Sequence, residues 1–416
     1  MQDFIWPEEF PGAHWLDSRE ESAIMDVLKN GSLFRYYGLN APKWVDKFEA
    51  AAKEYYDVDY ALTVNSGTGA LICSMKALGV GPGCEVIVPS FMWVATIGAV
   101  IQCGAIPVLC EIDKSFTMDI KDLENKITEK TKLIVPIHMA GAPCDMDSIM
   151  EIAAKYNLAV LEDCAQCNGG SFKGRKVGTF GDMGIFSLQL NKNMTSGEGG
   201  LIITNNKKLY KRAFSAHDMG LTRENGRLAE PAPYAQMWGE GRRMNEMCGA
   251  IASVQLDKLN DIVNSMHCSK YRIINMLQEN FGLNFRQIHD QAGDTGAFVI
   301  ILLEEEQNAL AAIDIFKARG IHNAFRLADY GLHIYYNIKS LTKKLPSTCM
   351  GFPWEHEANR NSNYNYTKGA CPNSDKLFER SILIPIPSCI NNSQEKQAAE
   401  IIGSTLEKLQ NEGVAV

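Results

Sequence analysis

The feature that most constrains this chain is an alternation of short apolar runs with stretches of helical character between about Tyr60 and Thr204. It predicts a mainly parallel sheet wrapped by helices, the α/β class, because parallel strands are joined by crossover connections that are usually helical. In such sheets, polar chemistry gathers just beyond the carboxyl ends of the strands. The expected strands lie near residues 85–88, 106–112, 133–137, 159–161 and 200–204.

The remaining sequence predicts a second, smaller unit. Helical periodicity over 245–281 is followed by an α+β pattern that ends in a helix over 394–411. We therefore expect a large domain with an N-terminal arm over 1–265 and a smaller α+β domain over 266–416. The segment 339–369 is rich in Asn, Pro and Ser, so it is predicted to be a long surface loop.

The bulk composition is that of a folded protein with little attraction for nucleic acid. Of its 416 residues, 46% are hydrophobic and 22% are charged, which is typical of globular domains. The 41 basic and 49 acidic residues give a net charge of −8, and no long run of Lys or Arg appears. A phosphate backbone would therefore be repelled, and no nucleic-acid partner is expected.

The cysteines and the N-terminus bear on the compartment. Twelve cysteines at irregular spacings favour reduced thiols over a disulfide framework. Cys164 and Cys167 form a C-x-x-C pair, but without a second pair or a nearby His no metal is expected there. The acidic N-terminal segment is interrupted by Pro7 and does not resemble a signal peptide. These features predict a cytoplasmic protein.

Residues 86–110 carry no charge over a length that would cross a bilayer. Pro89, Gly104 and Pro107 divide the segment into a strand, a helix and a second strand. A β-α-β unit in a buried sheet is therefore preferred to a membrane span.

Ser66, Gly67 and Thr68 follow an expected strand and open an apolar helix, so free N–H groups and the positive end of the helix dipole face outward. This arrangement binds phosphate. It lacks the lysine of a G-x-x-x-x-G-K-[ST] loop, which argues against a nucleoside triphosphate. The alternative is an ordinary N-cap before a core helix.

Asp163 closes a buried apolar run, where an ionised carboxylate requires a cationic partner. A pyridinium nitrogen fits, and a helix N-cap or a structural ion pair is the alternative. Lys192 lies between an apolar strand and a glycine-rich turn, where a desolvated amine becomes nucleophilic. Taken singly it is only a loop lysine. Together, the phosphate cradle, the acid and the lysine supply the three handles that pyridoxal 5'-phosphate (PLP) requires.

These motifs resemble those of the DegT/DnrJ/EryC1/StrS family of sugar aminotransferases, in which similar S-G-T-x-A, E-D-x-A-Q and F-S-x-x-x-x-K-x-x-x-x-G-E-G-G strings occur in this order. The resemblance covers most of the chain and is strongest over residues 58–256. It implies a type I aminotransferase fold, with a mainly parallel seven-stranded sheet in the large domain and a smaller α+β C-terminal domain. It also implies a homodimer whose active sites are shared at the subunit interface.

The resemblance implies a role for each matching residue of the site. Lys192 would form a Schiff base with PLP and then move the proton, and Asp163 would pair with the pyridinium nitrogen. Gln166 would hydrogen-bond near the ring hydroxyl. Trp93 would stack on the ring, although an aromatic at such a position is also typical of a core. The phosphate would be held by Ser66, Gly67, Thr68 and Ser187.

His138 and two departures from the family pattern concern the rest of the site. His138 follows a strand and is either catalytic or a satisfied structural histidine. The family usually has Gly-x-Asn-x-Arg-Met, but Gly241 stands here in place of the Asn that reaches the neighbouring subunit's phosphate. Arg242 or the adjacent arginine would then supply a charged phosphate contact. The usual substrate loop is also replaced, and Arg35 and Tyr37 are its candidate substrate-binding residues.

The resemblance implies an aminotransferase of amino-sugar biosynthesis for a polysaccharide or an antibiotic. It would move nitrogen from glutamate or glutamine to a keto or aldehyde sugar: a nucleotide-linked ketosugar, 8-oxo-octulosonate or a cyclitol. Some relatives are PLP-dependent dehydratases with His in place of the Schiff-base lysine, and Lys192 argues against that alternative. A non-catalytic ligand-binding regulator is the other alternative, because a fold does not prove a function.

Overall fold

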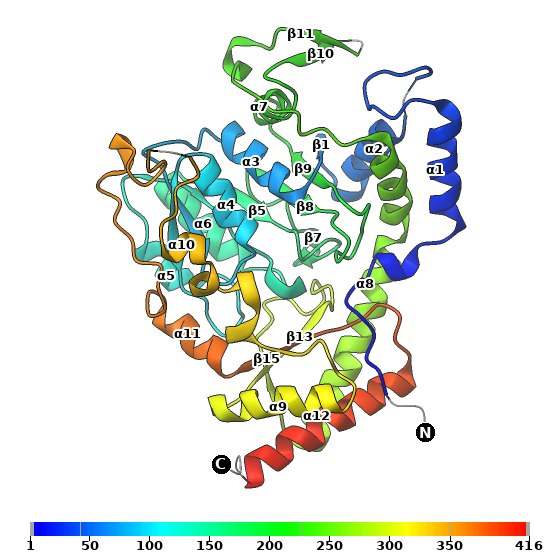
Figure 1. Cartoon of the computed structure of the whole chain (residues 1–416), viewed down its shortest axis with the longest axis vertical. Helices are drawn as coiled ribbons and strands as arrows, with labels where there is room; N and C mark the ends of the chain where they lie inside the picture. Colours follow the sequence, from blue (N-terminus) through cyan, green and yellow to red (C-terminus); the bar gives the residue numbers. More distant parts are fainter. Residues whose placement is uncertain (1–3, 42, 225, 349, 413–416) are drawn as a thin grey trace.

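The computed structural model describes residues 4–41, 43–224, 226–348 and 350–412. Within these residues the large domain contains a seven-stranded sheet of order β1-β9-β8-β5-β4-β2-β3 (Figure 1). All neighbouring strands pair in parallel except β9, which runs antiparallel to both β1 and β8. The predicted mainly parallel, seven-stranded sheet is therefore confirmed. Its strands are β1 (Tyr60–Val64), β2 (Glu85–Pro89), β3 (Ile106–Cys110), β4 (Thr131–Ile134), β5 (Ala159–Asp163), β8 (Met183–Ser187) and β9 (Gly200–Thr204).

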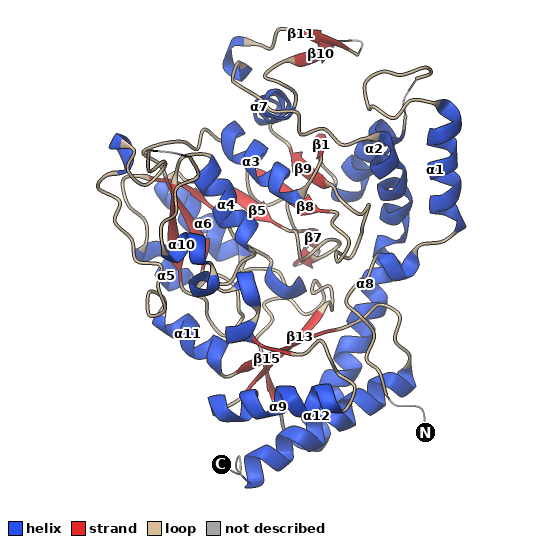
Figure 2. Cartoon of the chain, viewed as in Figure 1, coloured by secondary structure: helices blue, strands red, loops and turns tan. Residues whose placement is uncertain are grey.

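Helices cover both faces of this sheet (Figure 2), because successive strand residues alternate between apolar clusters on opposite faces. In β1, Leu62 packs in the cluster that contains residues of α3, α4 and α7, whereas Ala61 packs with residues of α2 and α8. Ile87 of β2 packs instead with residues of α6. These helices are α2 (Trp44–Tyr56), α3 (Gly67–Ala77), α4 (Val94–Gln102), α5 (Ile120–Asn125), α6 (Met146–Tyr156), α7 (Lys207–His217) and α8 (Glu246–Phe281).

The smaller domain contains a second sheet, of order β12-β13-β15-β14, whose neighbouring strands all pair antiparallel. Helix α9 contacts β14 and β15 of this sheet, and α12 packs against α9 at the lower end of the molecule (Figure 1), so this unit is α+β as predicted. Its elements are β12 (Asn284–Phe285), β13 (Phe298–Leu302), α9 (Glu306–Ala318), β14 (Phe325–Arg326), α10 (Lys339–Thr342), α11 (Pro372–Glu379), β15 (Ser381–Pro385) and α12 (Asn392–Glu412).

Two long elements join the domains. Helix α8 is continuous for 36 residues and packs against α2 of the large domain and α12 of the small one. The predicted boundary at residues 265 and 266 falls inside this helix and stays a prediction. The N-terminal arm also crosses between the domains: the indole N–H of Trp6 donates to the carbonyl of Pro385 (2.9 Å), and the N–H of Gly12 donates to the carbonyl of Lys192 (3.1 Å).

The segment 339–369 differs in part from the surface loop that was predicted. Beyond α10 it has little regular structure, but Asn359 and Tyr366 are buried against the large domain. The Asn359 side chain donates to the carbonyl of Gly104 (3.0 Å), and the Tyr366 hydroxyl donates to that of Pro107 (2.7 Å). These polar side chains are buried because they satisfy backbone groups of the turn before β3 and of β3 itself, which composition alone does not reveal.

Residues 86–110 form β2, α4 and β3, as the β-α-β interpretation predicts. Within the described part of the chain, no helix combines the length and apolar character needed to span a bilayer. Two further antiparallel ribbons, β6 (Ser171–Phe172) with β7 (Arg175–Lys176) and β10 (Thr222–Glu224) with β11 (Arg227–Ala229), lie outside the two sheets.

A buried ion pair links α1 (Ser18–Asn30) to α8. The Lys258 ammonium group donates to both carboxylate oxygens of Glu20 (2.7 Å each) and to the carbonyl of Trp15 (2.6 Å). We expect Lys258→Met to lower the free energy of unfolding by about 3–5 kcal/mol, because the Glu20 charge stays buried without its counterion. Urea unfolding measures this loss. The exposed control Lys29→Met on α1 should change stability by less than about 0.5 kcal/mol, and an equal loss in both variants would contradict the assignment.

Candidate active site

A cavity of about 490 Å³ opens where the carboxyl ends of several large-sheet strands meet. Asp163 and Ser187 are the last residues of β5 and β8, and Ser66 and Trp93 lie in the connections after β1 and β2. This is the edge at which open α/β sheets bind ligands. The cavity brings together eight of the predicted site residues: Ser66, Gly67, Thr68, Trp93, Asp163, Gln166, Ser187 and Lys192.

The first turn of α3 forms a cradle for an anion. Ser66 is the N-cap of this helix, and its hydroxyl accepts a hydrogen bond from the N–H of Gly69 (3.0 Å). The N–H groups of Gly67 and Thr68 belong to the first turn and have no intrahelical acceptor. A Cβ atom on Gly67 would come within 2.8 Å of the Ser187 side chain, so glycine permits the close approach of these two walls. The cradle has the geometry and the dipole direction that phosphate requires.

Asp163 presents a buried carboxylate to the cavity. Its side chain accepts hydrogen bonds from the Thr96 hydroxyl (2.9 Å) and the Ala165 N–H (3.1 Å). Burial raises the pKa of Asp163, while these hydrogen bonds and the positive charge of Lys192 oppose the rise. An acid that is nearly inaccessible yet held by two donors is suited to a cationic partner in the cavity.

Lys192 lies in the loop between β8 and β9, which confirms the predicted arrangement of strand, lysine and glycine-rich turn. Its N–H donates to the Gln189 carbonyl (3.0 Å), and its side chain lines the cavity. Burial lowers the pKa of the Lys192 amine, against the raising effects of Glu9 and Asp163. A lowered pKa increases the fraction of neutral, nucleophilic amine near neutral pH.

Gln166 and His333 also line the cavity and contact each other. The Gln166 amide oxygen accepts from the Ala140 N–H (3.1 Å), so its nitrogen donates to Nε2 of His333 (3.2 Å). His333 is therefore the neutral tautomer with its proton on Nδ1, which faces the Tyr330 carbonyl (3.3 Å). Burial and the charge of Lys192 lower the pKa of His333 to about 3. Its ring stacks on Tyr330 and lies 4.7 Å from Trp93.

His138 does not line the cavity. It is fully buried, its Nδ1 accepts from the Cys144 N–H (3.0 Å), and its Nε2 lies 3.2 Å from the Glu162 carboxylate. The backbone N–H of His138 donates to the backbone carbonyl of Asp163 (3.1 Å). A catalytic role for His138 stays a prediction, and these contacts support the structural alternative.

Arg35, Tyr37 and Arg242 also lie outside the cavity of their own chain. The Arg35 guanidinium is buried, and its two terminal nitrogens each form a hydrogen bond of 2.9 Å with Glu49 inside the large domain. Its Nε is buried without a hydrogen-bond partner among the described residues. Tyr37 is 65% exposed. Arg242 packs beside Gly69 in the first turn of α3, pairs with Glu240, and has a buried Nε without a hydrogen-bond partner among the described residues.

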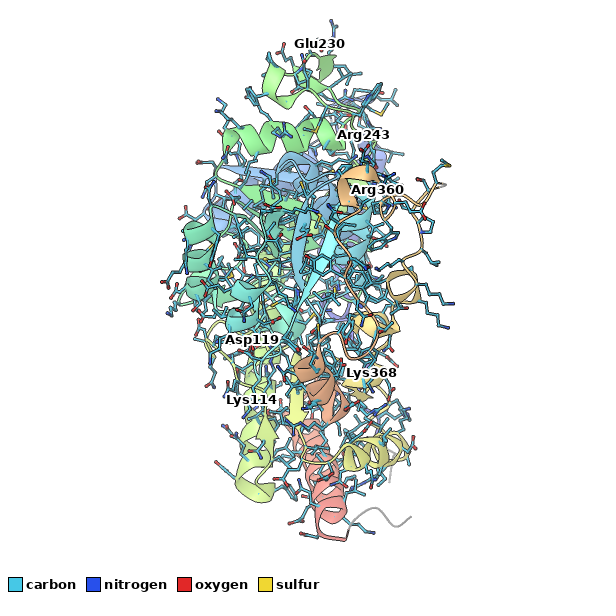
Figure 3. The ribbon with its side chains drawn as sticks, turned by 90° about the vertical axis from the view of Figure 1, so that its left-hand side faces the viewer. Lys114, Asp119, Glu230, Arg243, Arg360 and Lys368 are labelled. Atoms are coloured by element: carbon cyan, nitrogen blue, oxygen red, sulfur yellow. The ribbon has the colours of Figure 1, made fainter. Side chains whose placement is uncertain are left out.

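Arg243 is committed elsewhere. It forms an ion pair with the buried Asp218 (2.6 Å) and lies at the same end of the molecule as Glu230 (Figure 3). Arg223 pairs with the same carboxylate (2.6 Å). The predicted phosphate contact of Arg242 or Arg243 therefore concerns a neighbouring subunit and stays a prediction.

Three residues near this site were not predicted. Thr96 supports Asp163 from α4, and a threonine in an apolar helix gives no local signal. His333 comes from the small domain, although the His-Ile-Tyr-Tyr string at 333–336 marks it as unusual. Glu9 of the arm shares a small adjoining cavity with Lys192, and an acidic residue near a terminus is ordinarily solvated.

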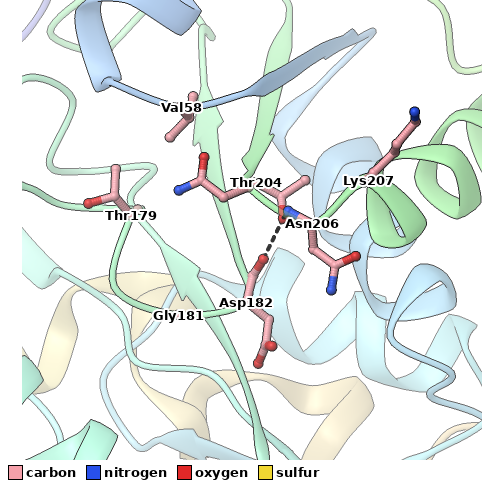
Figure 4. A pocket seen from close by; sticks show the side chains of 9 residues that line it. Val58, Thr179, Gly181, Asp182, Thr204, Asn206 and Lys207 are labelled. Carbon is pink, nitrogen blue, oxygen red and sulfur yellow. Dashed lines mark hydrogen bonds between the residues drawn. The ribbon is translucent and has the colours of Figure 1, made fainter.

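A second cavity, of about 470 Å³, lies at the N-terminus of α7 (Figure 4). It is lined by residues that include Thr179, Asp182 and Lys207, and the Thr204 hydroxyl donates to the Asp182 carbonyl (2.7 Å). None of the predicted site residues lines it. Its Lys207 provides a matched control for Lys192.

The comparison with known proteins identifies the class. The model of the DegT/DnrJ/EryC1/StrS aminotransferase family matches residues 16–403. The chain therefore belongs to this family, which confirms the resemblance seen in its motifs.

Individual relatives agree. GDP-perosamine synthase of Escherichia coli O157:H7 is 38% identical over 60% of this chain and 66% of that protein. L-glutamine:2-deoxy-scyllo-inosose aminotransferase of Micromonospora echinospora is 34% identical over 62% of this chain and 61% of that protein. The chain thus spans just under two thirds of the length of these two relatives. The solved structure of an aminotransferase from Psychrobacter cryohalolentis superposes with a TM-score of 0.79 at 26% identity, over 98% of this chain and 100% of that one.

PLP is the cofactor of this family, and the residues of the cavity fit it. The cradle at Gly67 and Thr68 suits its phosphate, and the buried Asp163 carboxylate suits its ring nitrogen. The Lys192 amine lines the same cavity and suits its carbonyl carbon.

The lowered pKa of His333 predicts a pH-dependent stability. The unfolded chain takes up a proton at His333 near pH 6.5, whereas the folded chain does so only near pH 3. Stability linked to His333 is therefore present above pH 6.5 and is lost as the pH falls toward 3. We expect wild type to lose about 1–2 kcal/mol more stability than His333→Asn between pH 6.5 and 5, measured by urea unfolding. Parallel curves for the two proteins would contradict this.

Proposed function

We propose that the chain is a PLP-dependent aminotransferase that moves an amino group from glutamate or glutamine to a keto or aldehyde carbon of a sugar. The observation that supports this best is that Lys192, Asp163 and the α3 cradle line one cavity. Each suits a different part of the cofactor. Family membership supports the same reaction class.

Each residue has a defined task in this proposal. PLP, when bound, draws electrons from the substrate carbon and carries the amino group between the two substrates. Asp163, held by Thr96, keeps a proton on the ring nitrogen. Lys192 takes up a proton at its Nζ atom and then releases it, because the lowered pKa of the amine lets it act first as base and then as acid. Gln166, oriented by Ala140, and the Trp93 ring hold the cofactor plane.

The proposed substrate class is supported by the residues that line the cavity and by the two relatives named above. Gln189, Asn191 and Glu198 line the cavity beside Lys192 and offer hydrogen-bonding groups for a hydroxyl-rich ligand. The name of the first relative gives GDP-perosamine as its product, and the name of the second gives an inosose as its substrate. A nucleotide-linked ketosugar, a cyclitol and 8-oxo-octulosonate are the proposed substrates, with Arg35 and Tyr37 kept as proposed substrate contacts.

A homodimer is part of the proposal. The β10–β11 ribbon and the loop before α2 pack together, because Arg223 lies over the rings of Phe34 and Tyr36. These two segments and the residues that flank the ribbon expose apolar side chains, here called the ribbon patch, which a second subunit would cover. In such a dimer Arg242 is the proposed contact to the partner's phosphate. The patch consists of Tyr37, Leu39, Met219, Leu228, Tyr234 and Trp238.

The eleven described cysteines are free thiols. Reduced thiols are typical of a reducing compartment, which supports the cytoplasm as the proposed location.

We expect Lys192→Ala to lose the visible absorption band of bound PLP and to lower the rate of amino transfer about 10²–10⁴-fold, since it removes the proton-transferring amine. Absorption spectra after reconstitution with PLP measure binding. Conversion of a nucleotide-linked ketosugar, an inosose and 8-oxo-octulosonate, with glutamate and with glutamine, measures the reaction.

The exposed control Lys207→Ala should keep both the band and the rate. A wild-type protein without PLP would overturn the proposal. A wild type that binds PLP but cannot transfer nitrogen from either donor would exclude those donors.

The dimer is tested at Trp238, whose side chain is 92% exposed in the single chain. We expect Trp238→Asp to weaken dimerisation at least tenfold, because a charge would be buried in an apolar contact. Sedimentation velocity across a concentration series measures this. Met350→Asp, at an exposed apolar side chain outside the ribbon patch, should leave the wild-type dimer unchanged, and a monomeric wild type would refute the interface.

A further inference from the structure

The N-terminal arm is held on both sides of Glu9. Before it, Trp6 is buried, and its N–H donates to the Gly320 carbonyl (2.8 Å). After it, the Pro11 carbonyl accepts from the Ser388 hydroxyl (2.8 Å), and Gly12 bonds to the Lys192 backbone. None of these contacts uses the Glu9 side chain. The backbone of the arm therefore places Glu9 beside the Lys192 loop independently of its carboxylate.

Glu9 and Lys192 line the same small cavity, of about 20 Å³. That volume accommodates about one water molecule. The other walls with hydrogen-bonding groups come from Gln166, Asn191, Asn193, Tyr330 and His333. The cavity holds little solvent, so charges that face it are weakly screened from one another.

The charges around Glu9 point to Lys192 as its partner. Glu8, on the same arm, is exposed and repels it. On the small domain, His333 is neutral and Tyr330 has its pKa raised by burial, so neither carries charge near neutral pH. Burial raises the pKa of Glu9 to about 7, and Lys192 opposes this rise. Lys192 is thus the one cation that faces this carboxyl among the residues lining the small cavity.

We propose that Glu9 is a positioning residue of the active site, whose carboxylate stabilises the protonated Lys192 amine and so sets the pH range in which Lys192 exchanges protons. The inference rests on the proposed role of Lys192 in amino transfer. The coupling itself concerns only two side chains of this chain and is measurable without substrate.

The test is the protonation of Lys192 in the full-length, PLP-free protein. Competitive labelling with acetic anhydride across pH 6–11, read by peptide mass spectrometry, gives the midpoint at which the Lys192 amine becomes reactive. We expect Glu9→Gln to lower this midpoint by about one pH unit, because a carboxylate that stabilises the ammonium form is lost. Glu9→Asp keeps the charge and should fall between Glu9→Gln and wild type.

Glu8→Gln is the matched control, since it removes the same charge from the neighbouring exposed position, where solvent screens it. Its midpoint should stay within about 0.2 pH unit of wild type. No variant should melt more than about 2 °C below wild type. An unchanged midpoint in Glu9→Gln, or an equal shift in Glu8→Gln, would overturn the inference. A shifted midpoint in a protein that lacks aminotransferase activity would support the coupling while the proposed function fails.

Discussion

The site depends on the hydrogen bonds that the buried carboxylate of Glu162 accepts. This carboxylate accepts hydrogen bonds from the N–H groups of Gly178, Phe180 and Gly181, at 2.6–2.7 Å, and faces His138. These contacts fix the turn that leads into β8 on one side and the segment that follows β4 on the other. Asp163, the next residue along β5, therefore enters the cavity from a rigid strand. A buried acid is tolerable here because its oxygens are satisfied by donors that the backbone holds in place.

The parts of the site that were predictable are those encoded by local sequence. A strand followed by a glycine-rich helix start, or by an acid, signals its position at the sheet edge from a few adjacent residues. Lys192 and Asp163 were found in this way. Arg35 shows the limit: its place in the loop that replaces the family's substrate loop suggested a ligand contact, but its pairing with Glu49, in α2, is visible only in the structure. The difference lies in tertiary packing, which periodicity does not encode.

The same reasoning explains why His333 was missed. His333 reaches Gln166 from the small domain, 167 residues further along the chain. The main strands of the large sheet and several of the helices were anticipated from short apolar runs and helical periodicity, but the way the domains meet depends on side chains that are not adjacent in sequence. Arg286 illustrates this, since it is buried and donates to the carbonyl of Met139 (3.1 Å), in the turn whose Ala140 orients Gln166.

The continuity of α8 has a mechanical consequence. A single helix of 36 residues extends about 54 Å and belongs to both domains. Hinge motion between domains concentrates in a few residues that absorb large changes in backbone angles, and an unbroken helix offers no such point. The small domain, which contains His333, is thus connected to the large domain by a stiff helix. We therefore expect ligands to enter and leave through the movement of loops and neighbouring side chains, rather than through an opening motion between the two domains.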